Sequence, residues 1–576
     1  MKFYSVYLLC VVCLIFQSCQ HSNTKHIEST DELEESWWWP MQPVPKGIVT
    51  CDKGTTHGEN ALVYSLSGLV AKAHKEGKVD ELVWINSRGD YAKWYKRVVQ
   101  RLNLQERGDF DVWKLLTRYK ELGIVDGYIL YSQEKEPKYN SDMNFSYNVA
   151  VSYAGLKKAL VIEQSIEGKI KALGFTKLFD ARNVTLDDCF HTLKKSLNNE
   201  LVLTMNPFFH NNSDFAIANN SMSLYGVTDV ANDVMSWLRP VSPVVGWNHG
   251  DEIDFTRLPS EYGLFNTASD WCDNLLTLSA GSKNAIPKKI KSLNPKDIDF
   301  NDTGHFHSFI MSDGDNMQWT IGRFLSDGNY WGSDLHGQFP VGFTSCPVNL
   351  SMMANDVLDE MVESKPLHTS IIEFGGGYQY PDLFAVKKGV EREELQRSFA
   401  RKLNIHMKRT GAKIFGFICT DFDSQDAKDA YKIYAEELDD IIGMVVIQYA
   451  PYHGGHGDVI WVKNRMGIEI PVVSAKFSLW NGLNEPGGGD VHKITNCINK
   501  QVEESSKTLS WTSVHAWSRF ENPKRTEEYG TGMKPIKWCI DNLDRKIKVI
   551  SPEELLWRIR WNHNQDQTGK LIRDNY

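Results

Sequence analysis

The sequence predicts an α/β protein with three small amino-terminal α/β domains followed by a carboxyl-terminal (β/α)8-like barrel. Short apolar runs alternate with amphipathic segments along most of the 576 residues, as in parallel strands joined by helices. After about residue 300 this alternation becomes regular and yields eight strand–helix units, the number found in a (β/α)8 barrel. The length by itself indicates several domains.

The first 18 residues are expected to form a lipoprotein signal peptide. Lys2 gives one positive charge, residues 3–16 are an apolar run too short to remain a membrane span, and Ser18 precedes Cys19 in a degenerate lipobox. We expect Cys19 to be lipidated and the protein to be exported as an outer-membrane lipoprotein, on the periplasmic or the cell-surface face. A plain signal peptide cut elsewhere is the alternative. Residues 20–36 are polar and end in an acidic run, and we expect a flexible tether over residues 19–45.

The remaining composition narrows the class of protein. No later segment has eighteen unbroken apolar residues, so the lipid is the expected membrane contact. The net charge is −9 and no basic tail is present, which argues against a nucleic-acid partner. Of the ten cysteines, the seven beyond Cys19 are scattered and form no Cys-x-x-Cys pair, so no zinc or iron–sulfur spacing is visible among them. The sequence does not indicate an oligomeric state.

The three amino-terminal domains are expected at residues 46–112, 113–185 and 186–295. Each contains apolar runs of strand length beside segments with helical spacing. The expected helices lie at 62–74, 91–102, 112–122, 153–160, 166–173 and 186–198, and the expected strands at 82–86, 127–130, 148–151, 201–205 and 244–247. Trp37, Trp38 and Trp39 precede the first domain, and we expect them to pack on its surface rather than to form a ligand platform.

Residues 296–576 are expected to form the barrel-like domain. Its eight predicted strands lie at 305–312, 341–345, 369–374, 413–420, 444–449, 470–477, 510–517 and 548–550. The connection after the fifth strand is rich in glycine and resembles a loop rather than a helix. A distorted or seven-stranded barrel is therefore the alternative to a regular one.

Two of the predicted strands end in the pattern Asp-x-Asp. Asp313 and Asp315 follow the first strand, and Asp421 and Asp423 follow the fourth. Residues two apart in extended chain point to the same side, so each pair can direct two carboxylates into the mouth of a barrel. Paired carboxylates can hydrolyse glycosides or hold a hard cation. Aspartates at strand ends also cap helices and form turns without any catalytic role.

Other strand ends offer groups suited to a sugar. The third strand carries Glu373 and runs into Gly375–Gly377, Tyr378 and Tyr380. Glycines allow close approach of a ligand, and tyrosines offer apolar faces with a polar tip; a glycine turn with core tyrosines is the alternative. The expected substrate-binding residues are Gly377, Tyr378, Tyr380, Gln448, Tyr452, His453, His515 and Trp517. The histidines could instead be solvent-facing or core residues.

Residues 375–381 match the pattern Gly-x-Gly-Tyr-x-Tyr-Pro, and the chain thereby resembles the GxGYxYP family, which is assigned to glycoside hydrolysis. The string at 312–316 resembles a second family motif, and those at 66–70 and 269–275 are similar to weaker ones. The resemblance implies three small amino-terminal domains, a carboxyl-terminal α/β domain of catalytic type, and an origin in Bacteroidetes-like bacteria that process polysaccharides. Residues 478–481 and 487–489 depart from the family, which leaves the substrate open.

Three functional hypotheses follow. The first is a glycoside hydrolase without a cofactor, in which the acid and the base or nucleophile come from Asp313, Asp315, Glu373, Asp421 and Asp423. The second is a metal-dependent carbohydrate deacetylase or lyase with a divalent cation such as Ca²⁺ or Mg²⁺. The third is a glycan-binding lipoprotein without catalysis. A carbohydrate is the expected partner in all three.

Overall fold

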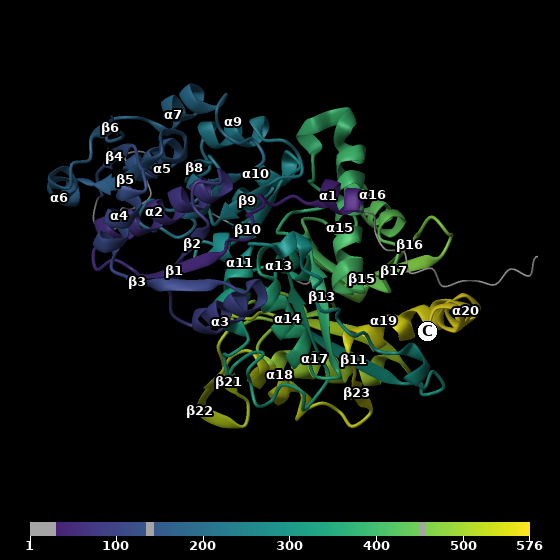
Figure 1. Cartoon of the computed structure of the whole chain (residues 1–576). Helices are drawn as coiled ribbons and strands as arrows, with labels where there is room; N and C mark the ends of the chain where they lie inside the picture. The colour runs from purple at the N-terminus through teal and green to yellow at the C-terminus, as the bar shows by residue number, and fades with distance from the viewer. Residues whose placement is uncertain (1–29, 134–142, 251, 449–454) are drawn as a thin grey trace, which may run out of the picture.

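The computed structural model describes residues 30–133, 143–250, 252–448 and 455–576. Three small parallel sheets come first in the chain, and one large curled sheet follows (Figure 1). Within the described residues, no helix combines the length and the apolar character needed to cross a membrane. The sheets and the helices between their strands form a mixed α/β fold, as the alternating sequence pattern predicts.

The amino-terminal half contains three parallel sheets that follow one another in sequence. The first has the order β2-β1-β3, the second β5-β4-β6 and the third β10-β9-β7-β8. The strands are β1 (Gly47–Asp52), β2 (Glu81–Asn86), β3 (Gln105–Phe110), β4 (Gly127–Tyr131), β5 (Ala159–Glu163), β6 (Lys177–Asp180), β7 (Val202–Thr204), β8 (Met222–Leu224), β9 (Pro243–Gly246) and β10 (Phe265–Ala268).

Helices pack these sheets into one continuous core. The long helix α2 (His57–Lys75) contacts β2 of the first sheet, β5 of the second and α8 beside the third. A Cβ on its Gly68 would come within 2.6 Å of the backbone of Asp214, so the helices meet at backbone distance. The other helices are α1 (Thr30–Ser36), α3 (Tyr91–Leu102), α4 (Val112–Glu121), α5 (Ser146–Lys157), α6 (Glu167–Ala172), α7 (Leu186–Leu193), α8 (Ser213–Ala218), α9 (Asp229–Trp237), α10 (Glu252–Glu261) and α11 (Leu275–Leu278).

The second sheet corrects one sequence prediction. Residues 148–151 were expected in a strand and 153–160 in a helix, but α5 spans Ser146–Lys157 and the strand β5 follows it. All residues from 146 to 155 are buried, so this part of α5 has no solvent-exposed face. Without such a face the sequence shows no amphipathic period of 3.6, and a short apolar run then resembles a buried strand.

The carboxyl-terminal half contains every strand expected after residue 300. They are β11 (His305–Met311), β12 (Val341–Ser345), β13 (Thr369–Phe374), β14 (Ile414–Cys419), β15 (Gly443–Gln448), β17 (Glu469–Ser474), β20 (Thr508–Val514) and β23 (Ile547–Val549). Three further short strands join the sheet, β16 (Val459–Lys463), β18 (Phe477–Leu479) and β19 (Gly488–Gly489). The order is β16-β17-β15-β14-β13-β12-β11-β20-β18-β19, with β23 beside β11.

The sheet is curled rather than a regular eight-stranded barrel. The predicted strand at 470–477 is bent into β17, which pairs with β15, and β18, which pairs with β20. At the bend, Ala475 N–H donates to Val446 O (3.0 Å) and Lys476 N–H to Trp511 O (3.1 Å). The two arms of the sheet thus meet at residues 475–476. One bent strand bridges them, whereas β23 lies only against the start of β11.

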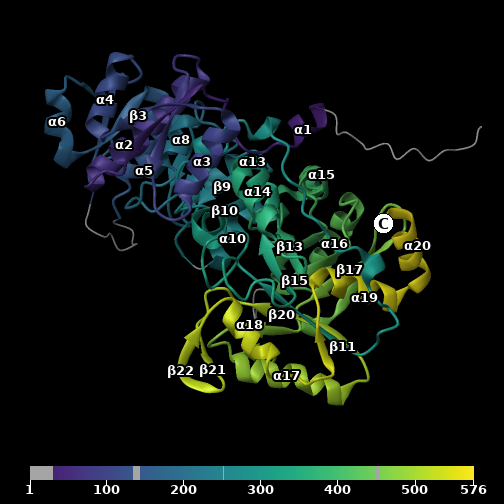
Figure 2. The ribbon, with the colours of Figure 1, turned by 60° about the horizontal axis from the view of Figure 1, so that its bottom comes forward.

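The curled sheet separates an inner core from an outer layer of helices (Figure 2). Inward side chains such as Ile310, Ile372, Ile418 and Trp511 form one apolar cluster. The helix α19 packs against the amino-terminal ends of the strands, where Gly342 leaves room for Pro552. The surrounding helices are α12 (Met317–Trp319), α13 (Pro347–Met353), α14 (Asn355–Ser364), α15 (Arg392–Thr410), α16 (Gln425–Glu437), α17 (Val491–Glu504), α18 (Met533–Ile540), α19 (Pro552–His563) and α20 (Gln565–Asn575).

The tryptophan string packs at a different place from the one expected. Trp38 and Trp39 both donate their indole N–H to Asn349 Oδ1, at 3.1 and 2.9 Å. Trp38 also contacts Phe265 of the third sheet and Phe399 of α15 edge-on or tilted. The string therefore lies between the third sheet and the carboxyl-terminal half, not on the surface of the first sheet.

Candidate functional site

The loop after β11 has a glycine that no other residue could replace. Gly314 N–H donates to Thr344 Oγ1 (2.9 Å), and a Cβ at this position would lie 1.6 Å from Thr344 O on β12. Asp313 just before it has φ +67°, a left-handed conformation that aspartate tolerates better than most residues. The contact with β12 fixes the loop, and with it the aspartates on both sides of Gly314.

Asp313 is held by residues at the end of the neighbouring strand β20. Trp517 Nε1 donates to Asp313 Oδ1 (3.0 Å), and the N–H of Ala516 reaches Oδ2 at 3.4 Å. The Ser312 hydroxyl also donates to Oδ2. Three donors directed at one carboxylate suit a group that carries negative charge.

Asp315 has the opposite environment. Burial, first, and then the negative charges of Asp313 and Glu252 together raise the pKa of its carboxyl to about 8. A carboxyl with this pKa is protonated at neutral pH and can donate a proton. The loop after β11 therefore presents one carboxylate held by three donors and one carboxyl whose pKa is raised.

Glu252 is a site residue that sequence reasoning missed. It begins α10 in the third amino-terminal unit and accepts a hydrogen bond from the Tyr378 hydroxyl. Tyr378 lies there because its N–H and C=O pair with Asn266 of β10, at 2.8 and 2.9 Å. Its ring lies parallel to Trp247, with centroids 6.2 Å apart. The predicted binding residue Tyr378 thus joins the third sheet to the carboxylates of the site.

Aromatic side chains line the other side of Asp313. Trp517 is 47% exposed, and its ring lies 4.5 Å from that of Trp319. Trp480 stacks on His515 at 3.8 Å and 7°. His515 Nδ1 lies 2.8 Å from Ser518 Oγ, and burial lowers its pKa while the charge of Asp313 opposes that effect. The predicted pair His515 and Trp517 therefore lies at the same strand ends as Asp313.

Asp270 is a second carboxyl that the sequence did not single out as functional. Burial raises its pKa to about 6, and Gln318 forms a hydrogen bond with its side chain. Gln318 lies three residues after Asp315 and also accepts the N–H of Trp271. The segment at 269–271 thus packs directly on the helix that follows the Asp-x-Asp motif.

Glu373 lies outside the mouth that the sequence predicted for it. Its neighbours Ile372 and Phe374 point into the inner core, so the side chain of Glu373 points into the outer layer. There it is fully buried, and its Oε2 accepts the N–H of Val348 at the start of α13 (2.8 Å). Burial raises its pKa to about 8. Its position favours a structural role in seating α13.

The glycines and the second tyrosine of the Gly-x-Gly-Tyr-x-Tyr-Pro string are buried. A Cβ on Gly377, whose φ is +132°, would come within 2.3 Å of the ring of Phe265. Tyr380 is fully buried in the inner core. These positions favour the glycine turn with a core tyrosine, the alternative that the sequence left open.

The second Asp-x-Asp motif is exposed. Asp421 Oδ1 accepts the N–H of Asp423 (3.0 Å), which forms a local turn, and Asp423 lies 3.6 Å from Lys428 in an exposed ion pair. Neither side chain contacts Asp313 or Asp315 through a hydrogen bond. The backbone of Gln448 ends β15, but its side chain, Tyr452, His453 and Cys19 lie outside the described residues, so their roles stay predictions.

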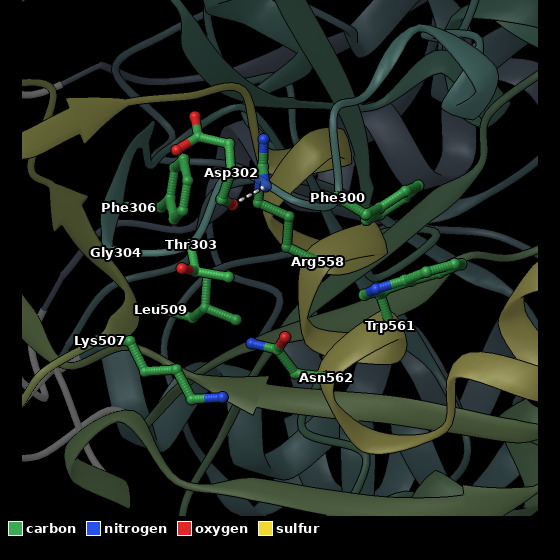
Figure 3. A pocket seen from close by; sticks show the side chains of 10 residues that line it. All are labelled: Phe300, Asp302, Thr303, Gly304, Phe306, Lys507, Leu509, Arg558, Trp561 and Asn562. Carbon is green, nitrogen blue, oxygen red and sulfur yellow. Dashed lines mark hydrogen bonds between the residues drawn. The ribbon is translucent and has the colours of Figure 1, made fainter.

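Two other features lie away from this site. Among described residues, one group of three ligand atoms could hold a metal ion, formed by Asp187, His191 and Asp233 on the exposed surface of the third unit. A small cavity of about 20 Å³ lies at the amino-terminal ends of β11 and β20, and Phe306 and Arg558 are among its lining residues (Figure 3). In barrel-like folds that end serves stability, while the carboxyl ends carry the chemistry.

The fold and the site define a barrel-like α/β protein with an acidic site at the carboxyl ends of its strands. Three models of one family match the chain, namely its second domain at residues 125–201, its third domain at 199–280, and the "GxGYxYP putative glycoside hydrolase C-terminal domain" at 304–560. The chain belongs to the GxGYxYP family, as the motif at 375–381 indicated.

A solved structure shares the fold over nearly the whole chain. It is a crystal structure from Bacteroides thetaiotaomicron VPI-5482, described as that of a "putative hydrolase", with a TM-score of 0.75 and 23% identity. The match covers 91% of this chain and 96% of that one. Among curated proteins, none matches the chain significantly. At this identity the likeness supports the fold.

Proposed function

We propose that the protein is a glycoside hydrolase in which Asp315 is the general acid and Asp313 the base or nucleophile. The observation that carries the proposal is the contrast between the two carboxyls. Asp315 has a pKa raised to about 8, whereas Asp313 accepts hydrogen bonds from Trp517 and Ser312. Glycosidases need one protonated and one ionised carboxyl on either side of the scissile bond.

The surrounding side chains suit a carbohydrate. Trp517 and Trp480 supply flat apolar faces against which the C–H faces of a sugar can pack. Glu252 adds a third carboxylate, which raises the pKa of Asp315 and is held in place by Tyr378. In this proposal Glu252 is a positioning residue that keeps the acid protonated.

The test is product release from a panel of oligosaccharides. Asp315→Asn and Asp313→Asn should each lower kcat/KM by about 10² or more, the usual contribution of an acid or base, while Asp187→Asn on the exposed face of α7 serves as control. Asp315→Asn should spare substrates with an activated dinitrophenyl leaving group, which needs no proton. Full activity of both variants on unactivated oligosaccharides would refute the assignment.

We also propose that the enzyme is anchored through a lipid on Cys19. The proposal rests on the apolar run at 3–16 and on Ser18 before Cys19. Metabolic labelling with a radioactive fatty acid should mark the wild-type protein and not Cys19→Ser. Equal labelling of both proteins would contradict it.

A further inference from the structure

A cleft of about 980 Å³ lies between the first amino-terminal sheet and the carboxyl-terminal half. One wall consists of the loops after β1 and β2, including Lys53 and Arg88. The other consists of Arg323 and its neighbours in the π-helix Thr320–Phe324, which continues directly from α12. Trp517, which donates to Asp313, belongs to both the cleft and the proposed active site. Trp517 therefore joins the cleft to that site.

The two walls are fixed to each other. Asp90 N–H donates to Gly322 O (2.8 Å), and the buried Trp94 donates its indole N–H to Ile321 O (2.7 Å). A Cβ on Gly89 would lie 2.3 Å from the same Gly322 O. The loop after β2 thus packs at backbone distance on the helix after the Asp-x-Asp motif.

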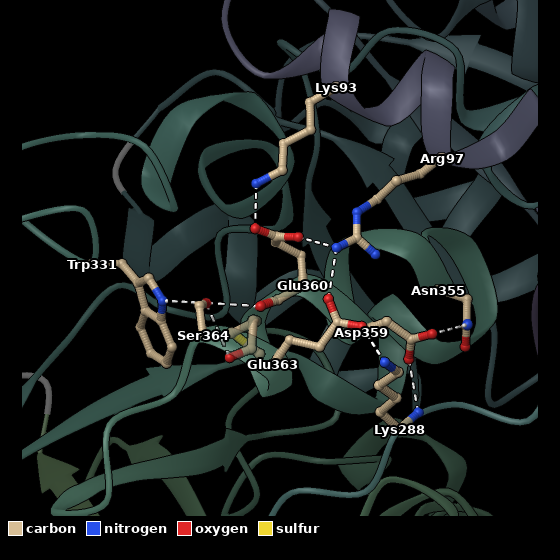
Figure 4. Close-up of polar contacts among 10 residues, drawn as sticks. Lys93, Arg97, Lys288, Trp331, Asn355, Asp359, Glu360, Glu363 and Ser364 are labelled. Carbon is tan, nitrogen blue, oxygen red and sulfur yellow. Dashed lines mark hydrogen bonds and ion pairs between the residues drawn. The ribbon is translucent and has the colours of Figure 1, made fainter. Parts of the chain in front are cut away.

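Ion pairs on the neighbouring helices strengthen this contact. Figure 4 shows Lys93 and Arg97 of α3 reaching the carboxylates of Glu360 and Glu363 on α14. The Arg97–Glu363 distance is 2.7 Å. These ion pairs join α3 to α14 beside the cleft.

The cleft has aromatic surfaces that the packing of the fold does not require. Trp271 is 55% exposed and Trp517 47%. The ring of Trp271 is supported by Phe209, at 4.7 Å, and its backbone N–H donates to Gln318. Two large exposed indoles facing one cleft offer stacking surfaces for successive sugar rings.

The charge of the cleft is opposite to that of the chain. Asp273 is the acidic residue among those lining it, and its carboxylate accepts from Lys53 Nζ (2.8 Å), Ser87 Oγ (2.6 Å) and Asn211 Nδ2 (2.8 Å). Lys53 is thus neutralised, and the guanidinium groups of two exposed arginines remain.

Those two arginines have few partners of their own. Arg323 is 74% exposed by side chain and lies 3.7 Å from Asp327, and Arg88 has no hydrogen bond or ion pair to another described residue. The chain as a whole carries a net charge of −9, so a local cationic surface marks the cleft for an anion.

We propose that this cleft binds the chain of an anionic glycan, with Arg88 and Arg323 pairing with its carboxylate or sulfate groups and Trp271 and Trp517 stacking on its rings. Guanidinium groups form two parallel hydrogen bonds with carboxylates and sulfates. The inference rests on the proposed hydrolase function, since Trp517 lines the cleft and also donates to Asp313. In this proposal the loops after β1 and β2 of the first amino-terminal sheet take part in substrate recognition.

The test measures binding separately from hydrolysis. The Asp315→Asn protein is titrated calorimetrically with a hexagalacturonate and its methyl ester, and with a sulfated galactan hexasaccharide and its desulfated form. At least one charged glycan should bind about tenfold or more tightly than its neutral counterpart. Adding Arg88→Gln or Arg323→Gln to the Asp315→Asn protein should each lower the affinity for that charged glycan about tenfold. Arg239→Gln, an exposed arginine outside the cleft, should leave the affinity unchanged.

The two charged glycans distinguish carboxylate from sulfate as the source of the negative charge. The measurements of binding and of hydrolysis distinguish the two proposals. Preference for the hexagalacturonate assigns uronate, and preference for the galactan assigns sulfate. If neither charged glycan binds more tightly than its neutral form, or if the arginine variants bind as well as the Arg239→Gln control, the inference is overturned. Arginine-dependent binding without any product from the wild-type protein would instead refute the proposed hydrolase while supporting the cleft.

Discussion

The pKa of Asp315 makes a quantitative prediction about the pH dependence of catalysis. At a pKa of about 8, about nine molecules in ten carry the proton at pH 7, and about one in ten at pH 9. At the ordinary value of 3.8, fewer than about one in a thousand would carry it at pH 7. The raised pKa therefore increases the protonated fraction at neutral pH by about 10³.

The direction of the pH dependence follows from the role of Asp315 as general acid. A general acid works only when protonated, so kcat/KM should be constant below pH 8 on account of this group and fall tenfold per pH unit above it. The perturbation that tests the cause is Glu252→Gln, which removes one of the two negative charges that raise the pKa. Without that charge ionisation is easier, so the descending limb should move to lower pH.

The assay is the pH profile of kcat/KM on an oligosaccharide that the panel identifies as a substrate. The descending limb of the wild-type profile should lie near pH 8. The limb of Glu252→Gln should lie at lower pH, and that of Asp187→Asn should coincide with the wild type. Tyr378→Phe removes the hydroxyl that holds Glu252 and should shift the limb less than Glu252→Gln. A limb that stays in place in Glu252→Gln, or one that moves to higher pH, would refute the electrostatic argument.

Two further predictions concern stability. The pKa of the buried Glu373 carboxyl is raised from 4.5 to about 8, which corresponds to about 5 kcal/mol in the free energy of unfolding. This contribution is fully present below pH 4.5 and is lost as the pH rises through 8. Urea unfolding of Glu373→Gln should therefore lose stability less steeply than the wild type over this range, and identical slopes would contradict the reasoning. Gly377→Ala should cost about 2 kcal/mol or more, because its Cβ would strike Phe265. Gly467→Ala, at φ +75° with open space around it, should pay only the backbone strain, about 1 kcal/mol.

The strands of the carboxyl-terminal half could be predicted because they are buried on both faces. Parallel strands of this kind are continuous apolar runs with polar residues at the ends, and the boundaries of β12 and β13 coincide with those expected. The helix α5 could not be recognised in this way, because a helix buried on every side is an apolar run as well.

The site was only partly predictable, because its members come from distant parts of the chain. Asp313, His515 and Trp517 could be expected together, since the carboxyl ends of parallel strands meet at one edge. Glu252 lies on a helix of another unit, and it reaches the site through the pairing of Asn266 with Tyr378. No local pattern around Glu252 indicates that contact.

The two Asp-x-Asp motifs show how one residue separates a candidate site from a surface turn. In the motif at 313–315 the middle residue is Gly314, which passes at backbone distance from Thr344 and keeps the loop against β12. In the motif at 421–423 the middle residue is Phe422, which is buried and accepts the Tyr431 hydroxyl at its carbonyl (3.0 Å). In this turn the phenylalanine is the buried residue, and both flanking aspartates are exposed to solvent. The glycine has no side chain to bury, so its aspartates can stay at the strand ends, where burial and mutual charge raise one pKa.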